Sequence, residues 1–245
     1  MSIKKQKIPV ICYHNIGIQK EIDKIEQKSK RWIIEKNFFE KQIRLIKKLG
    51  YKTLTLKEFE QWKKNEIQLP YMSMLITFDD GFLNVYKYAL PILKKYHMNA
   101  VIFIEGNTVN NHTIPDDTDQ THIYMSKEVI DKCKKEYENI EFACHSYGLH
   151  TNGSVESKSY KELEEDLEKY KEVMGETHYF AYPFGHYTEE MKKVLKDNGY
   201  KLAFAFGPGR KARKEDDDFL VSRIDTSFGM KNWKFVIKMV LPFIY

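Results

Sequence analysis

Short apolar runs alternate with amphipathic stretches along most of the chain. Between residues 37 and 50, apolar side chains recur every three or four positions up to Gly50, which predicts a helix ending at this glycine. The apolar runs are shorter, lack this spacing and are bounded by turn residues, so they predict buried strands. Strands are expected at 8–14, 51–56, 72–81, 100–105, the first part of 140–150, 178–185, 201–207 and 219–225. Helices are expected at 37–50, 56–64, 83–97, 126–136, 155–175, 188–200 and 232–245.

This order of elements predicts an α/β fold with parallel strands joined by crossover helices. Seven or eight such units favour a barrel or partial barrel over an open doubly wound sheet. A chain of 245 residues is long enough for one such barrel, so we expect a single domain over residues 1–245. Within the helix at 83–97, Pro91 predicts a kink or a late start.

Composition and charge narrow the class of protein. The net charge is +5, but only five residues are arginine, and no basic helix is present, which disfavours a nucleic-acid partner. The three cysteines form no CxxC pair, so neither a zinc ribbon nor a disulfide scaffold is indicated. The N-terminus lacks the apolar region and cleavage site of a signal peptide, which predicts a cytoplasmic location.

Reactive and turn-forming side chains follow the predicted strands. Active sites of parallel barrels lie at the carboxyl ends of the strands, so these positions are candidates for chemistry. They are His14, Asp79 with Asp80, His145 with His150, Pro183 with Phe184, and Asp225.

The two histidines and one of the two aspartates form a possible metal-binding set. His145 and His150 are five residues apart, which excludes a shared helical face but permits convergence on a loop containing Gly148. Two imidazoles and a carboxylate leave one coordination position of a zinc ion open for water. The structural alternatives are an Asp-Asp-Gly turn and two polar loop histidines.

These motifs carry a family resemblance. TFDDG at 77–81, HSYGLH at 145–150 and AYPFG at 181–185, in this order, resemble the polysaccharide deacetylase family (carbohydrate esterase family 4, the NodB homology domain). The likeness extends to most of the chain and is greatest for the branch of the poly-N-acetylglucosamine deacetylases. It implies a distorted (β/α)₇-type barrel and a divalent metal, most commonly Zn²⁺, with Co²⁺, Ni²⁺, Fe²⁺ and Mn²⁺ as alternatives.

The resemblance also implies roles for individual residues. Asp79 aligns with the catalytic base, and the metal ligands align with Asp80, His145 and His150. Pro183 and Phe184 align with the wall of the substrate groove, and the Phe184 N–H with an oxyanion donor. Tyr147, inside the histidine motif, is a candidate for stacking on a sugar ring, with core packing as the alternative.

The chain departs from the family pattern at three places. The histidine motif is one residue longer than the commonest form, as in the exopolysaccharide branch. Ala181 stands where the family has an arginine that orients the base, and Arg223 is the candidate to replace it. The C-terminal Leu-x-His is missing, and His14, in a Tyr-His pair, is the candidate for the acid role.

The sequence thus predicts a metal-dependent hydrolase that removes N-acetyl groups from an amino sugar or glycan and releases acetate. The alternatives are a catalytically weak carbohydrate-binding relative and a deformylase-type hydrolase acting on a lipid-linked sugar. We expect a monomer. The apolar tail at 233–245 either closes the bottom of the barrel or contacts lipid peripherally, which would place the protein at the inner membrane face.

Overall fold

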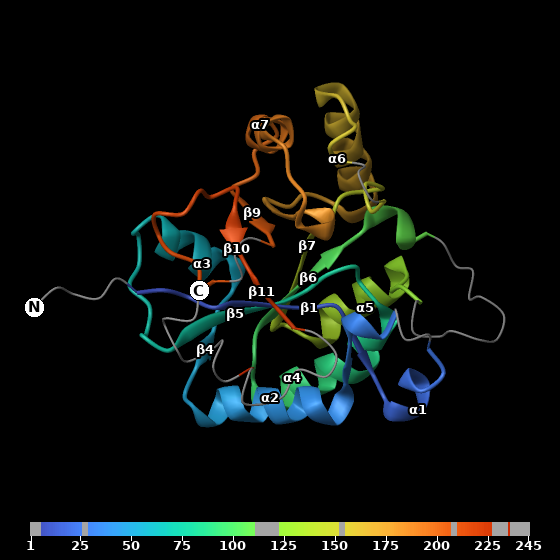
Figure 1. Ribbon diagram of the computed structural model, residues 1–245, viewed down its shortest axis with the longest axis vertical. Coiled ribbons are helices and arrows are strands. Elements are labelled where there is room, and N and C mark those ends of the chain that lie inside the picture. Colours follow the sequence, from blue (N-terminus) through green and yellow to red (C-terminus); the bar gives the residue numbers. More distant parts are fainter. Residues whose placement is uncertain are drawn as a thin grey trace, which may run out of the picture.

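The structure is a computed structural model that describes residues 6–25, 29–110, 123–151, 155–206, 210–226 and 235. Its centre is a wall of parallel strands in the order β10-β9-β8-β7-β6-β5-β1-β11 (Figure 1). The strands are β1 (Val10–Tyr13), β5 (Ser73–Phe78), β6 (Ala100–Ile104), β7 (Ile140–Cys144), β8 (Tyr179–Ala181), β9 (Leu202–Ala205), β10 (Val221–Ser222) and β11 (Ile224–Asp225). The predicted parallel barrel is confirmed.

A single extended segment closes this wall. β10 pairs with β9, β11 pairs with β1, and only Arg223 separates the two. The Arg223 N–H donates to the Ala205 carbonyl at 3.2 Å, and the Thr226 N–H donates to the Cys12 carbonyl at 3.1 Å. When β10 and β11 are counted as one strand, this order has seven strands, as in the (β/α)₇-type barrel that the family resemblance implies.

The helices lie outside the wall, with α2 and α4 on one side and α6 and α7 on the opposite side (Figure 1). They are α1 (Gln19–Ile22), α2 (Lys36–Lys48), α3 (Leu56–Lys63), α4 (Leu90–Tyr96), α5 (Lys127–Glu136), α6 (Tyr160–Met174) and α7 (Glu189–Asp197). None of the described helices is long and apolar enough to cross a bilayer.

Three predicted elements differ from the observed ones at their ends. α6 begins five residues later than predicted, because the Ser159 side chain and Glu162 form a capping box there. The strand predicted at 51–56 is reduced to β4 (Lys52–Thr53), since Thr55 already caps α3. Before Pro91 the chain forms a π-helix (Val85–Ala89) and only then α4, a local widening next to a residue that has no N–H to donate.

A small two-stranded sheet at the carboxyl end of β1 was not predicted. β2 (Asn15–Gly17) pairs with β3 (Ile33–Glu35), and the 3₁₀ turn Ser29–Trp32 precedes β3. The predicted C-terminal helix, including the whole 233–245 tail except Phe235, lies outside the described residues.

The inward side chains of the wall explain where the site forms. A buried apolar cluster includes Leu75, Phe103, Ala143 and Phe204, and successive inward positions along a strand are two residues apart. Continuing this alternation to the carboxyl ends reaches one set of residues at the barrel mouth. This set is His14, Asp79, Glu105, His145, Pro183, Phe206 and Arg223.

Candidate active site

Asp79 lies at the centre of the mouth and is held by Arg223. The guanidinium Nη1 donates to Asp79 Oδ1 at 2.6 Å, and Nη2 donates to Oδ2 at 2.8 Å. Both residues are buried, and burial alone would raise the pKa of Asp79. The positive charge of Arg223, with His145 and His14 nearby, outweighs burial and lowers that pKa, so Asp79 is ionised at neutral pH.

Asp80 reaches the same mouth although it follows Asp79 directly. Neighbouring side chains on a continuing strand point to opposite faces, but Asp80 has a φ of 72° and Gly81 a φ of 80°. This left-handed turn brings the Asp80 carboxylate to the two histidines. Its Oδ1 lies 3.3 Å from His145 Nε2 and 3.1 Å from His150 Nε2.

Asp80, His145 and His150 have the arrangement expected of metal ligands. The Ala181 carbonyl lies 2.8 Å from His145 Nδ1 and can only accept a hydrogen bond, so Nδ1 carries the proton and Nε2 is free to ligate. Asp80 Oδ1 is buried and has no hydrogen-bond partner. Lone pairs of an imidazole and a carboxylate therefore face one another, and a divalent cation bound between them would satisfy both. These residues fit a metal.

A second group, made of Cys12, His14 and Asp79, fits a metal poorly. Its ligand atoms are also close together, and Cys12 Sγ lies 3.5 Å from Asp79 Oδ2. However, both Asp79 oxygens already bind the Arg223 guanidinium, which would repel a second cation. Burial raises the pKa of the Cys12 thiol well above its ordinary value, so in the metal-free protein this group is a neutral thiol.

His14 stands between two aromatic rings beside Asp79. Its ring centroid lies 4.5 Å from that of Trp32 and 6.0 Å from that of Phe206. The side chain is 8% exposed, and its Nδ1 is buried without a hydrogen-bond partner. The imidazole is thus fixed by packing beside Asp79, with a buried ring nitrogen that has no hydrogen-bond partner.

The segment after β8 forms the side of the site next to His150. Pro183 is buried, whereas Phe184 is 43% exposed, and its ring centroid lies 4.5 Å from that of His150 in a tilted contact. The backbone of Phe184 is left-handed, with a φ of 55°. This strained turn presents the Phe184 ring beside His150.

Gly185 makes this turn possible, and its replacement by alanine is expected to be costly. Its φ is +73°, and an added Cβ would lie 2.7 Å from the backbone nitrogen and Cβ of Phe206. Gly50 has a similar φ of +76° but no atom within 4 Å of such a Cβ. Gly50→Ala should lose only the left-handed penalty of about 1–2 kcal/mol, and Gly185→Ala roughly 1–3 kcal/mol more from overpacking. Urea unfolding of both variants measures the difference, and equal losses would contradict the steric argument.

Tyr147 is partly buried against the barrel. An added Cβ at Gly106 would lie 2.9 Å from a ring carbon of Tyr147 and 3.1 Å from one of Tyr170, so these rings pack on Gly106. Stacking of the Tyr147 ring on a sugar stays a prediction.

Sequence reasoning missed Glu105 and Trp32. Glu105 is 7% exposed at the mouth end of β6, and burial raises its pKa despite the nearby His150 and His145. Glu105 follows Phe103 by two residues and therefore shares its inward face, so the alternation along the strand would have identified it. Trp32 lies in a segment without a clear pattern, and only the fold brings it to His14.

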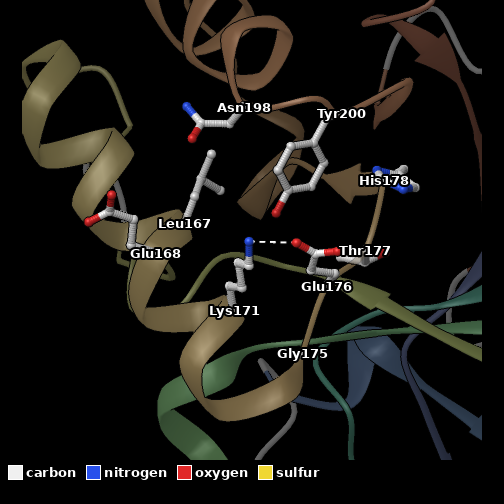
Figure 2. Close-up of a pocket in the computed structure, with 9 residues that line it drawn as sticks. All are labelled: Leu167, Glu168, Lys171, Gly175, Glu176, Thr177, His178, Asn198 and Tyr200. Carbon is white, nitrogen blue, oxygen red and sulfur yellow. Dashed lines mark ion pairs between the residues drawn. The ribbon is translucent and has the colours of Figure 1, made fainter.

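A cavity of about 180 Å³ lies elsewhere, between α6 and the segments that precede β8 and β9 (Figure 2). An ion pair of 2.6 Å joins Lys171 and Glu176 across it. Its lining comprises Leu167, Glu168, Lys171, Gly175, Glu176, Thr177, His178, Asn198 and Tyr200. None of the predicted site residues contributes, and the amino ends of barrel strands usually serve stability.

The mouth of this parallel barrel carries a His₂Asp group that fits a divalent metal, beside a buried aspartate that can accept a proton, an arrangement suited to a hydrolase. Comparison with known proteins agrees. The profile of the polysaccharide deacetylase family matches residues 66–203, more than half of the sequence. This chain therefore belongs to the polysaccharide deacetylase family, as its motifs predicted.

Relatives with described activities are similar over most of the chain. The poly-beta-1,6-N-acetyl-D-glucosamine N-deacetylase of Staphylococcus aureus is 31% identical over 205 residues, covering 80% of this chain and 68% of that protein. The enzyme of the same name from Staphylococcus epidermidis is 29% identical over 209 residues, with the same coverage.

Solved structures share the fold. The deacetylase PplD of Streptococcus pyogenes superimposes with a TM-score of 0.80 at 20% identity, covering 96% of this chain and 99% of that one. IcaB from Ammonifex degensii gives a TM-score of 0.73 at 25% identity, covering 90% and 92%.

Proposed function

We propose that this protein is a metal-dependent carbohydrate N-deacetylase that removes acetyl groups from the amino sugars of a glycan and releases acetate. The observation that carries the proposal is the convergence of a His₂Asp group with an ionised, arginine-bound aspartate at one barrel mouth. The His₂Asp group and the arginine-bound aspartate are neighbours because Asp80 directly follows Asp79 in the sequence.

Each residue has a chemical part in this proposal. Asp80, His145 and His150 would hold the metal, which when bound acts as a Lewis acid and lowers the pKa of water. Asp79 accepts the proton from the attacking water, and Arg223 keeps it ionised and oriented. The Phe184 N–H stabilises the negative charge that develops on the acetamide oxygen. His14 donates a proton to the departing amine.

The Asp79–Arg223 pair also favours an active enzyme over a weak carbohydrate-binding relative. The absence of an arginine at Ala181 was the main support for such a relative. Arg223 supplies the same guanidinium from the strand that closes the barrel, and the Ala181 carbonyl instead orients His145.

The substrate class follows from the relatives and from exposed aromatic side chains. The staphylococcal relatives are named for poly-β-1,6-N-acetyl-D-glucosamine, so we propose an N-acetylglucosamine polymer or its precursor. Phe184 and Tyr187 are 43% and 45% exposed on the loop after β8. Such rings stack on the apolar faces of sugars. We further propose a monomer, cytoplasmic or peripheral at the inner membrane face, with Zn²⁺ as the metal.

Replacement of Tyr187 tests this aromatic surface. We expect Tyr187→Ala to lower kcat/KM on N-acetylglucosamine oligomers about tenfold, equivalent to roughly 1.4 kcal/mol of lost stacking. Tyr71 is 72% exposed before β5, at the other end of the barrel, so Tyr71→Ala is the matched control and should change nothing. Equal kinetics for both variants would contradict a sugar-binding role for Tyr187.

The proposed function is tested by measuring acetate and formate release from N-acetylated and N-formylated sugars, with metal analysis of the same sample. We expect acetate release that depends on about one bound divalent ion per chain. Metal binding without any release would support the carbohydrate-binding relative. Release of formate alone would support the deformylase-type alternative.

A further inference from the structure

The loop that carries the two histidines is held by a carboxylate from α6. Asp166 is 7% exposed. Its Oδ2 accepts the Tyr147 N–H at 2.8 Å, and its Oδ1 accepts the Gly148 N–H at 2.8 Å. Both oxygens of one side chain therefore bind successive amides in the segment between His145 and His150.

A different element holds the carbonyls of the same segment. The Gly106 N–H donates to the Ser146 carbonyl at 2.9 Å, and the Asn107 N–H donates to the Tyr147 carbonyl at 2.9 Å. Ser146 has a φ of 68°, a left-handed conformation that a serine adopts only when its surroundings impose it. The loop is thus fixed by the turn after β6 through its carbonyls and by Asp166 through its amides.

The two histidines depend on this loop to different degrees. The His145 N–H donates to the Ile104 carbonyl, and its ring is fixed by the Ala181 carbonyl. His150 lies beyond the loop, and its side chain is 23% exposed. The position of its Nε2, 3.1 Å from Asp80 Oδ1, therefore depends on the path of the backbone between the histidines.

We propose that Asp166 is a positioning residue of the metal centre, which holds the 145–150 loop so that His150 faces Asp80 before the metal binds. The inference rests on the proposed metal-dependent function. Partners that hydrogen-bond a ligand side chain directly typically contribute about 10- to 100-fold to metal affinity, and we expect an effect in this range from a residue that fixes the backbone between two ligands.

The chemistry requires a carboxylate at this position. Two N–H donors need two acceptor oxygens, and an asparagine offers one oxygen and an NH₂ group that would oppose the second donor. Asp166→Asn therefore keeps the volume of the side chain and loses one hydrogen bond. Asp166→Glu keeps two acceptors on a longer stem.

Zinc affinity of the metal-free protein, measured by competition with a chromophoric chelator, tests the inference. Asp166→Asn should bind Zn²⁺ about 10- to 100-fold more weakly than the wild type, and Asp166→Glu should lose less. Saturating Zn²⁺ should restore most of the activity of Asp166→Asn. Glu141→Gln is the matched control, since Glu141 accepts the Leu56 N–H at 2.8 Å at the opposite end of β7. Its zinc affinity should equal that of the wild type.

Hydrogen exchange of the metal-free protein gives a readout that is independent of zinc affinity. The Tyr147 and Gly148 amides should be protected before zinc is added, and in Asp166→Asn they should exchange faster. Wild-type zinc affinity in Asp166→Asn, or unprotected amides in the wild type, would overturn the inference and leave the proposed function intact. A wild-type protein that neither binds zinc nor releases acetate would instead overturn the proposed function.

Discussion

Replacing Arg223 with methionine should both destabilise the protein and abolish acetate release. Arg223 is fully buried, and its guanidinium makes a two-point contact with Asp79. Its removal leaves the Asp79 carboxylate buried without a counter-charge, which typically costs about 3–5 kcal/mol. For a chain of this size the melting temperature should fall by roughly 6–20 °C, at about 2–4 °C per kcal/mol. Calorimetry measures the stability, and an acetate assay measures the activity.

Two further variants separate the charge from the packing. Arg210 forms a similar two-point pair with Asp216, but the side chains are 26% and 9% exposed, so Arg210→Met should cost less than Arg223→Met. Combining Arg223→Met with Asp79→Asn removes both buried charges and should recover part of the stability lost by Arg223→Met alone. An Arg223→Met protein with wild-type stability would show that the pair is not buried as described.

Asp80→Asn should remove the metal, whereas Asp79→Asn should retain it and still inactivate the protein. Asparagine tolerates the left-handed backbone of Asp80, so the turn should persist. The loss of a carboxylate ligand should weaken zinc binding by more than the roughly 100-fold that loss of an outer partner causes. Asp79 is proposed as the base, and Asp79→Asn should lower kcat about 10²- to 10⁴-fold. Metal analysis beside the acetate assay measures both properties.

Chelation of the wild type provides the control for this pair. Removal of the ion should reproduce the Asp80→Asn activity, and added Zn²⁺ should restore the wild type but not the variant. If Asp80→Asn keeps its metal, or if Asp79→Asn loses it, the assignment of Asp80 as metal ligand and Asp79 as base is contradicted.

The alternation of strands and helices was predictable because each element buries its own face. Side chains two residues apart on a strand share a face, so the inward-facing positions of β5 and β7 lead to Asp79 and His145 at the mouth. Asp80 follows from its sequence neighbour, because Gly81 permits the turn that changes its direction.

Contacts between distant segments were harder to predict. The pairing of Arg223 with Asp79 spans 144 residues, and the family pattern suggested it only through the missing arginine at Ala181. Trp32 reaches His14 through a small sheet that no periodicity indicates. Asp166 looks like one acidic residue among several on a charged helix, and only its two backbone contacts distinguish it.

The strand that carries Arg223 also affects how the protein is made. A ribosome synthesises Asp79 long before Arg223, so the nascent chain holds a carboxylate that cannot yet be buried at low cost. Until β10 and β11 emerge, β9 and β1 each present an unpaired edge that can pair with another chain. Emergence of β10 and β11 therefore completes the wall and pairs the buried Asp79 carboxylate with its counter-charge in one docking step. A message truncated just before codon 221 should yield an aggregating product rather than a weakly active one.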